Sequence, residues 1–404
     1  MSELSYLGKL LDGVEVEWKM LGEVIHSLKT GLNPRQNFSL NTLDAQGYYV
    51  TVREIQNGKV VFLDKTDRVN DRALKIINGR SNLEAGDILF SGTGTVGRIA
   101  VIEENPINWN IKEGVYTIKP IKEKIAPRFL SYLLQSSKIV KDYSKKIVGN
   151  PVISLPMGDL KKLLIPIPCP DNPEKSLAIQ SEIVRILDKF TALTAEITAE
   201  LNMRKKQYNY YRDQLLSFKE GEVEWKTLGE VAVIGTGNHD TQDAIEHGKY
   251  IFYARGREPL KLNVFDFDET AIITAGDGAG VGKVFHYAKG KYALHQRAYR
   301  IVPNAFMNPR FVYHYITAYF FTYIQKASVS SSVTSLRRPM FLKFPIPVPP
   351  SEEQARIVEI LDKFDTLTNS ITEGLPREIE LRQKQYEYYR DLLFSFPKPE
   401  TVSN

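Results

Sequence analysis

One long helical pattern constrains this chain more than any other feature. Apolar residues in the stretch 178–218 follow one another at steps of three or four, and neither glycine nor proline interrupts them. This spacing puts the apolar side chains on one stripe of a single helix of about 40 residues, roughly 60 Å long. A stripe this narrow on a helix this long requires a partner helix.

The chain supplies that partner, because the same helix is present twice. IVRILDKF at 183–190 returns as IVEILDKF at 357–364, and KQYNYYRD at 206–213 returns as KQYEYYRD at 384–391. Two such copies can pair antiparallel about a pseudo-twofold axis and form a spine. We expect the spine or a subunit interface to include Ile183, Ile186, Phe190, Leu193, Ile197, Leu201, Tyr208, Tyr211, Ile357, Ile360, Phe364, Leu367, Ile371, Tyr386 and Tyr389.

Two features of the spine stay open at this point. The tyrosines near each helix end form either a bare subunit interface or the closure of the coil's own end. The second copy contains Gly374-Leu375-Pro376, and a proline at this point is expected to kink or break the helix.

The segments between the helices are repeated as well. VEWKMLGEV from Val16 returns as VEWKTLGEV from Val223, and each copy opens a segment of β-rich runs and turns. Each segment then continues into a helical run, 128–144 or 310–327, and ends on a proline-rich turn, IPIP from Ile165 or FPIP from Phe344. The predicted strands are 48–55, 58–64, 86–91, 97–102 and 114–120 in the first segment, and 250–255, 271–275, 283–287 and 298–303 in the second.

These repeats predict a mixed α/β (α+β) protein with two α/β domains separated by two long antiparallel coiled-coil helices. The residues before the first domain resemble the end of a spine helix, so the two chain ends are expected to lie close together. The predicted boundaries are 1–15 for a segment completing the repeat, 16–168 for domain 1, 169–222 for spacer helix 1, 223–347 for domain 2, and 348–404 for spacer helix 2 and the tail. The helices are nearly identical while the domains share only a skeleton, which indicates a shared partner for the helices and different targets for the domains.

The composition excludes several classes of protein. The net charge of +5 indicates a mild preference for an anionic partner. The single cysteine, Cys169, excludes an intrachain disulfide and a cysteine metal cluster. The six histidines have no metal-ligand spacing, and we expect no metal site. With no signal-peptide pattern and no apolar run of about 18 residues, we expect a cytoplasmic protein without membrane contact.

Two glycine-rich stretches imitate nucleotide-binding loops. Phe90-Ser-Gly92-Thr-Gly94 resembles a methyltransferase loop for S-adenosylmethionine, and Gly276-Asp-Gly-Ala-Gly-Val-Gly-Lys283 resembles a phosphate loop. Neither has the residues that would complete its motif, and Val284 stands where the phosphate loop needs serine or threonine. Tight turns between strands explain both stretches better. With no catalytic motif elsewhere, we expect the chain to be non-catalytic.

Polar and basic residues near these turns and near the matching strand ends could contact DNA. Arginine, lysine, glutamine and serine on loops are the types that read base edges and phosphates, although a solvated surface position explains each of them taken singly. The candidates are Arg53, Ser91, Thr93, Thr95, Arg98, Lys112, Arg255, Arg257, Asp277, Lys283, His295, Gln296, Arg297, Ser331, Arg337 and Arg338.

The order domain, ILDKF helix, domain, ILDKF helix resembles the specificity subunit of type I restriction-modification systems, and most closely the IC-like branch. The resemblance implies a non-enzymatic subunit whose two target recognition domains each bind half of a bipartite duplex DNA site. It also implies two modification (methyltransferase) subunits on the helices and further restriction and translocase subunits. S-adenosylmethionine, ATP and Mg²⁺ would then belong to those partners. The alternatives are a protein-interaction scaffold and a self-contained methyltransferase.

A tandem repeat in the first helix suggests how the two half-sites are spaced. Thr194-Ala-Glu-Ile197 is followed by Thr198-Ala-Glu-Leu201, a repeat typical of this branch. One copy advances a helix by ~6 Å, which is between one and two base pairs at ~3.4 Å each. We hypothesise that the copy number sets the unspecified spacer, so that one more copy lengthens it by about one base pair.

Overall fold

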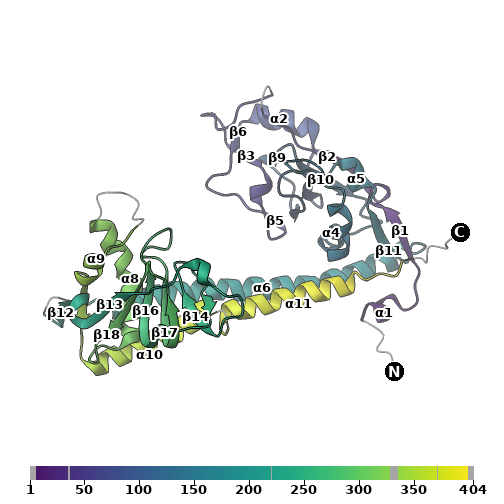
Figure 1. Ribbon diagram of the computed structural model, residues 1–404. Coiled ribbons are helices and arrows are strands. Elements are labelled where there is room, and N and C mark those ends of the chain that lie inside the picture. The colour runs from purple at the N-terminus through teal and green to yellow at the C-terminus, as the bar shows by residue number, and fades with distance from the viewer. Residues whose placement is uncertain (1–5, 35–36, 220, 328–334, 371, 399–404) are drawn as a thin grey trace. The chain divides into compact units, whose positions relative to one another are not determined.

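The computed structural model describes residues 6–34, 37–219, 221–327, 335–370 and 372–398 (Figure 1). It contains two compact units: unit 1 comprises Met1–Glu196 and Glu380–Asn404, and unit 2 comprises Ile197–Ile379. The division crosses both spacer helices. Each unit therefore holds the first part of one repeated helix beside the last part of the other, which is an antiparallel pairing.

The first spacer helix, α6, is continuous over Pro173–Leu215, 43 residues, as the apolar stripe predicts. The second is divided into α10 (Ser351–Asn369) and α11 (Leu375–Leu393). Gly374, with φ of +84°, precedes the new helix, and Pro376 is its second residue. Proline fits there because the first N–H groups of a helix have no helical acceptor. The predicted break at Pro376 is confirmed.

Unit 1 consists of small sheets surrounded by short helices. A four-stranded sheet has the order β2-β10-β7-β8, and a three-stranded sheet has the order β6-β3-β9 with β3 and β9 parallel. The elements are α1 (Tyr6–Leu11), β1 (Val16–Met20), η1 (Leu21–Glu23), β2 (Ile25–Thr30), β3 (Gly47–Val50), η2 (Val52–Glu54), β4 (Ile55–Gln56), β5 (Lys59–Val60), β6 (Arg68–Val69), α2 (Asp71–Arg80), β7 (Ile88–Ser91), β8 (Ile99–Val101), β9 (Trp109–Ile111), β10 (Val115–Pro120), α3 (Pro127–Leu133), α4 (Ser137–Ser144), α5 (Met157–Lys161) and β11 (Leu164–Pro168).

Unit 2 is built around one six-stranded sheet of order β13-β18-β16-β17-β14-β15. Its β14 and β17 are parallel, like β3 and β9 of unit 1, so the two domains share a skeleton. The elements are β12 (Glu224–Thr227), α7 (Leu228–Val231), β13 (Ala232–Thr236), η3 (Thr241–Asp243), β14 (Tyr250–Tyr253), β15 (Leu260–Leu262), β16 (Phe267–Ala275), β17 (Phe285–Leu294), β18 (Ala298–Pro303), α8 (Pro309–Ala327), α9 (Arg338–Leu342) and β19 (Pro345–Val348).

The proline-rich segments were predicted as turns, and this prediction was wrong. They are the strands β11 and β19, which pair antiparallel with β1 and β12, the strands of the VEWK phrase. Trp18 faces Pro166 in unit 1, and Trp225 faces Pro347 in unit 2. Proline is tolerated because each of these sheets has only two strands, so one edge of each strand needs no ladder hydrogen bond.

Three other predicted elements of unit 1 differ from the structure. The strand predicted over 58–64 is limited to the two residues of β5. The strand predicted over 48–55 ends at Val50, because Thr51 and Glu54 form a capping box that starts the 3₁₀ turn η2. The helical run predicted over 128–144 is two helices, α3 and α4, whereas its counterpart over 310–327 is the single helix α8.

The spine helices belong to the hydrophobic cores of the domains. Ile183 and Leu187 of α6 are buried in one core with Phe129 of α3 and with Tyr386 and Leu393 of α11. The α10 residues Ile357 and Leu361 are buried in the other core with Phe311 of α8. The repeated ILDKF phrase therefore attaches a domain to a helix, in addition to forming a helix pair.

The two ends of the described chain lie together in unit 1. Leu7 and Leu11 of α1 are buried in the same core as Phe394 and Phe396. The indole Nε1 of Trp18 donates a hydrogen bond to the backbone oxygen of Pro397 at 2.8 Å. The predicted proximity of the chain ends is confirmed.

Candidate nucleic-acid interface and helical spine

The same ionic anchor attaches each domain to its helix. In unit 1, Nη2 of Arg128 donates to Oδ1 of Asp188 at 2.5 Å. In unit 2, Nε and Nη2 of Arg310 donate to Oδ1 of Asp362 at 2.8 and 2.6 Å. Both aspartates are the Asp of ILDKF, and both arginines are the second residue of their helix.

A second donor completes each anchor, and it differs between the units. Asp188 also accepts a hydrogen bond from the Tyr132 hydroxyl at 2.6 Å, whereas Asp362 is 2.7 Å from Nε2 of the fully buried His314. Burial, reinforced by the bond to Asp188, raises the pKa of Tyr132 to about 12. Burial opposes ionisation of Asp362, but the hydrogen bonds from His314 and Arg310 outweigh it and lower the pKa of that carboxyl.

A buried glutamine forms a second repeated attachment. Gln180 is 0% exposed and Gln354 is 1% exposed. Oε1 of Gln180 accepts from the backbone N–H of Ala126 at 2.8 Å, and Oε1 of Gln354 accepts from that of Asn308 at 2.7 Å. Each side-chain amide therefore satisfies backbone groups at the start of the domain helix that would otherwise be buried without a partner.

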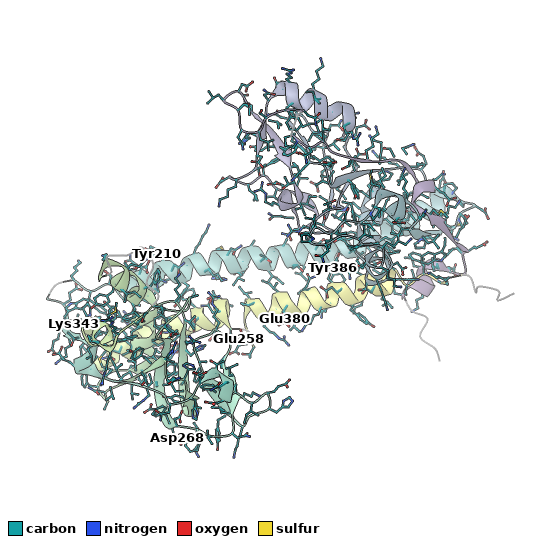
Figure 2. The ribbon with its side chains drawn as sticks, turned by 45° about the horizontal axis from the view of Figure 1, so that its top comes forward. Tyr210, Glu258, Asp268, Lys343, Glu380 and Tyr386 are labelled. Atoms are coloured by element: carbon teal, nitrogen blue, oxygen red, sulfur yellow. The ribbon has the colours of Figure 1, made fainter. Side chains whose placement is uncertain are left out.

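Aromatic residues at the helix ends form the same arrangement in both units. Phe190 stacks on Tyr389 with a centroid distance of 5.3 Å, and Phe364 stacks on Tyr211 at 5.5 Å. A further tyrosine stands edge-on to each stack, Tyr388 in unit 1 and Tyr210 in unit 2. These two are 65% and 62% exposed, and Figure 2 labels Tyr210 near the end of α6. Each helix end thus has an inner ring that closes the coil and an outer ring that faces solvent.

The other predicted spine residues differ in how deeply they are buried. Ile183, Ile357 and Tyr386 are buried, while Tyr211 and Tyr389 are exposed beyond their stacked faces. Leu193 is 37% exposed, and Ile371 lies outside the described residues. The partly buried ones are Ile186, Phe190, Ile197, Leu201, Tyr208, Ile360, Phe364 and Leu367.

Both glycine-rich stretches are turns between antiparallel strands, as predicted. One joins β7 to β8 and the other joins β16 to β17. Gly94 and Gly278 have φ of +79° and +81°, a region that favours glycine. An isolated bridge connects each turn to a loop further along the chain, Thr93 to Ser154 in unit 1 and Asp277 to Ser335 in unit 2.

The candidates of unit 1 gather around its glycine turn. Ser91 is buried, and its hydroxyl donates to the backbone oxygen of Thr95 and accepts from the N–H of Arg98, so it shapes the turn. The Arg98 guanidinium donates to the backbone oxygen of Val52 at 3.1 Å, which places it beside Arg53. Arg53 is half exposed and pairs with Asp67 at 3.2 Å. Thr95 and Lys112 are exposed, and Thr93 is partly buried.

Three candidates of unit 2 converge from three segments, and a fourth segment adds Ser335, which was not predicted. Arg255 follows β14, Asp277 follows β16, and Arg297 precedes β18. Nη1 of Arg255 and Nη1 of Arg297 donate to the two oxygens of Asp277 at 2.9 and 3.1 Å. Burial opposes ionisation of Asp277, but these two bonds outweigh it and lower its pKa. The fourth segment contributes Ser335, which is bridged to Asp277.

Other residues of unit 2 support this cluster or lie at its edge. His295 is 1% exposed, and its Nδ1 accepts from the N–H of Arg297, so it positions that segment from beneath. Burial is the main cause that lowers the pKa of His295, and the positive charge of the nearby Arg255 lowers it further. Gln296 donates to Asp240 at 2.9 Å. Arg257, Arg337 and Arg338 are exposed, Lys283 lies over the Phe321 ring, and Ser331 lies outside the described residues.

The arginine–aspartate and glutamine anchors were not predicted from the sequence. Their signal was nevertheless present, because Pro-Arg-Phe opens both domain helices at 127–129 and 309–311, and a glutamine stands eight residues before the Asp of each ILDKF. The carboxylates that hold the loop arginines, such as Asp67, have no counterpart in the other domain, so repetition could not have found them.

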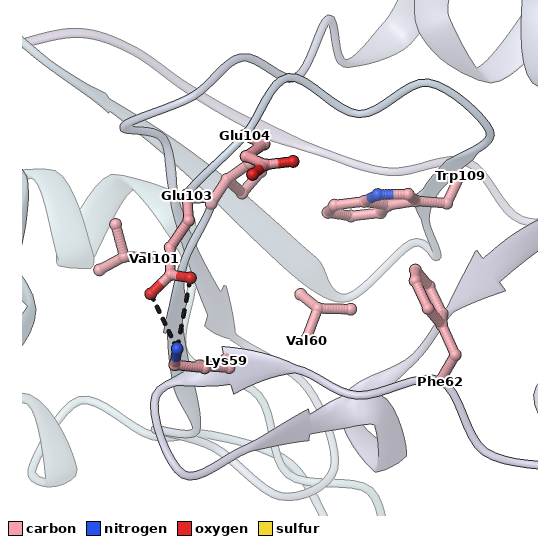
Figure 3. Close-up of a pocket in the computed structure, with 8 residues that line it drawn as sticks. Lys59, Val60, Phe62, Val101, Glu103, Glu104 and Trp109 are labelled. Atoms are coloured by element: carbon pink, nitrogen blue, oxygen red, sulfur yellow. Dashed lines mark hydrogen bonds and ion pairs between the residues drawn. The ribbon is translucent and has the colours of Figure 1, made fainter. Parts of the chain in front are cut away.

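A shallow hollow of about 220 Å³ lies on unit 1 and is lined by residues of β5, β8 and β9 and of the loops that follow β5 and β8 (Figure 3). Phe62 and Trp109 form one side of it, and Lys59 pairs with Glu103 at 3.1 Å on the other. In the part of the chain that the structure describes, no three His, Cys, Asp or Glu side chains are grouped to hold a metal ion. The described helices include none with the length and apolar character needed to cross a membrane.

Comparisons with known proteins agree with this architecture. The profile of the type I restriction modification DNA specificity domain matches residues 14–204 and again 220–381. The Escherichia coli EcoR124I/EcoR124II specificity subunit is 42% identical, with all of both chains covered. The Escherichia coli EcoprrI specificity subunit is 38% identical, covering 92% of this chain and 93% of the relative.

A solved structure has the same fold. The S subunit of a type I restriction-modification system from M. genitalium aligns with a TM-score of 0.59 at 17% identity, covering 96% of this chain and 98% of that one. The repeated helices, the two matched domains and the full-length relatives lead to one assignment. The chain belongs to the family of type I restriction-modification DNA specificity subunits.

Proposed function

We propose that this chain recognises DNA as the specificity subunit of a type I restriction-modification complex, with each domain binding one half of a bipartite target. It is the non-catalytic part of that complex and acts in the cytoplasm. Two modification subunits bind its helices, and restriction and translocase subunits join them. S-adenosylmethionine, ATP and Mg²⁺ are bound by those partners.

The observation that carries the proposal is the contrast between repeated anchors and divergent loops. Arg128–Asp188 and Gln180 in unit 1 have direct counterparts in unit 2 with the same partners. At the glycine turns, by contrast, Thr93 of unit 1 corresponds to Asp277 of unit 2. Two domains that are attached to the helices by the same contacts but differ in their loop residues are suited to two different DNA sequences.

The helix ends support binding of two copies of one partner. Each unit exposes the same edge-on tyrosine pair over a stacked phenylalanine. Exposed tyrosines are enriched in protein interfaces because they bury a large apolar area and retain a hydroxyl. Two equivalent patches on one chain fit a stoichiometry of two modification subunits.

Selection from random duplexes tests this function. We expect the chain, co-expressed with its modification subunit, to enrich two short fixed blocks separated by a fixed unspecified gap. No enrichment by an assembled complex would favour the scaffold alternative, and so would binding without steep salt dependence. Binding of S-adenosylmethionine by the isolated chain would favour the methyltransferase alternative.

Inserting one further Thr-Ala-Glu-Leu unit after Leu201 is expected to lengthen the preferred gap by about one base pair, since one copy advances the helix by ~6 Å. The tandem repeat spans the boundary between the units at Glu196 and Ile197. An insertion there lengthens α6 without entering either hydrophobic core. Selection from random duplexes measures the gap.

The matched control for this insertion keeps the helix length and changes the repeat's sequence. The double variant Thr198→Ala, Glu200→Ala should select the same gap as the parent chain. An unchanged gap in the insertion variant, with both fixed blocks still enriched, would contradict the spacer hypothesis.

A further inference from the structure

Two arginines of unit 2 are held by a single carboxylate at the surface. Asp277 uses one oxygen for Arg255 and the other for Arg297, at 2.9 and 3.1 Å. The Asp277 side chain is only 24% exposed, while those of Arg255 and Arg297 are 41% and 63% exposed. The carboxylate therefore lies behind the two guanidinium groups, and the cluster presents one net positive charge to solvent.

Each guanidinium retains donors for a ligand. An arginine has five N–H groups in a rigid planar fork. Among the described residues, Asp277 is the only side chain or backbone group that accepts a hydrogen bond from either guanidinium. The outward edges of both forks are consequently available for an acceptor pair.

The bracing favours a base edge over a phosphate as the acceptor. A phosphate accepts hydrogen bonds from many directions, so a mobile lysine or arginine can satisfy it. A guanine edge offers O6 and N7 in one plane, and a bidentate contact requires the fork to lie in that plane. Asp277 restricts the orientation of both forks before any ligand binds, and this restriction favours a bidentate contact with a guanine edge.

The position of this cluster agrees with a role in specificity. In unit 1 the position of Asp277 is occupied by Thr93, whose side chain has no charge to hold two arginines. Arg53, in the 3₁₀ turn η2 that follows the matching strand β3, instead pairs with Asp67 from a different loop. Among the residues that the structure describes, this braced pair occurs in unit 2 and has no equivalent in unit 1, so it is one of the features that differ between the domains.

We propose that Arg255 and Arg297 read guanine in the half-site bound by unit 2, and that Asp277 positions them. This inference rests on the proposed function, since it requires that unit 2 binds DNA. It assigns a direct base contact to the two arginines and a supporting role to the aspartate. The half-site of unit 2 must then contain at least one G·C pair.

The test compares Arg255→Lys, Arg297→Lys and Asp277→Asn in the full chain, co-expressed with its modification subunit, by selection from random duplexes. Lysine keeps the charge but loses the planar fork, and asparagine keeps the shape but loses the charge that holds two arginines. We expect each variant to lose roughly 5- to 100-fold discrimination at a guanine in one block. For the two lysine variants, affinity for non-specific duplex and its salt dependence should stay near those of the parent chain, whereas Asp277→Asn raises the net charge of the cluster and should strengthen non-specific binding.

The block read by unit 1 is the internal control and should be enriched as in the parent chain. A uniform loss of affinity with unchanged guanine preference would overturn the proposal in favour of a phosphate contact. A unit 2 block without any G·C pair would overturn it as well. If the parent complex enriches no bipartite target, the proposed function itself has failed, and the two failures are thereby distinguished.

Discussion

Replacing Gln354 by leucine is expected to destabilise unit 2 by at least about 3 kcal/mol, because it leaves three backbone groups without a partner and each such buried group costs about 1–3 kcal/mol. The Gln354 amide donates to the backbone oxygens of Phe306 and Pro349 and accepts from the N–H of Asn308. Leucine has a similar volume, so the variant removes these three partners without opening a large cavity. Hydrogen exchange of α8 amides measures the change in local opening free energy.

The repeat provides a matched control for this variant. Gln180→Leu removes the partners of Ala126 N–H and Lys124 oxygen in unit 1, so faster exchange should appear in α3 and leave α8 unchanged. If Gln354→Leu left exchange of α8 as in the parent chain, the glutamine would not be the attachment described above.

Replacing Asp362 by alanine is expected to destabilise unit 2 by about 2–3 kcal/mol, somewhat less than the ~3–5 kcal/mol of a fully buried pair. The substitution removes the two hydrogen bonds that Arg310 donates to Asp362. It also removes the side-chain partner that the described residues provide for the fully buried His314. Asp365 retains one contact to Arg310 at 3.1 Å, which limits the loss. Exchange of α8 amides measures this effect too, and Asp188→Ala in the more exposed anchor of unit 1 should cost less.

The contribution of Asp362 should also depend on pH. Its folded pKa is lowered, so its stabilising effect is complete above the ordinary carboxyl pKa of about 4 and is lost as the pH falls through the folded pKa. The difference between the parent chain and Asp362→Ala should therefore be constant near neutrality and shrink in acid below about pH 4. A difference that stayed constant through this range would show that the carboxylate charge is not what stabilises the anchor.

The architecture could be predicted because the sequence contains the domain and its helix as an internal repeat. The periodicity of 178–218 determined α6, the repetition of ILDKF identified the second helix, and Pro376 marked its break. The strand β11 was missed because proline is usually a turn signal, and only its pairing with β1 explains it. The 3₁₀ turn at Val52 was missed because a β-rich composition outweighed the capping box of Thr51 and Glu54.

The candidate interface could be located from the sequence but not resolved into roles. Glycine turns and strand ends gave the correct neighbourhood for Arg255, Asp277 and Arg297. Whether a side chain faces solvent or supports a neighbour depends on tertiary contacts that no local pattern encodes. Ser91 and His295 accordingly resemble surface contacts in the sequence, while the structure places them behind the residues they hold.

The shared core of the two chain ends determines when each unit can fold during synthesis. Unit 2 is one continuous segment, Ile197–Ile379, so all of its contacts are available once that segment has left the ribosome. Unit 1 begins first but needs Tyr386, Leu393 and Phe396 from the end of the chain to complete its core. The domain that is translated first therefore matures last, and a truncated nascent chain carries a finished second domain beside an open first one.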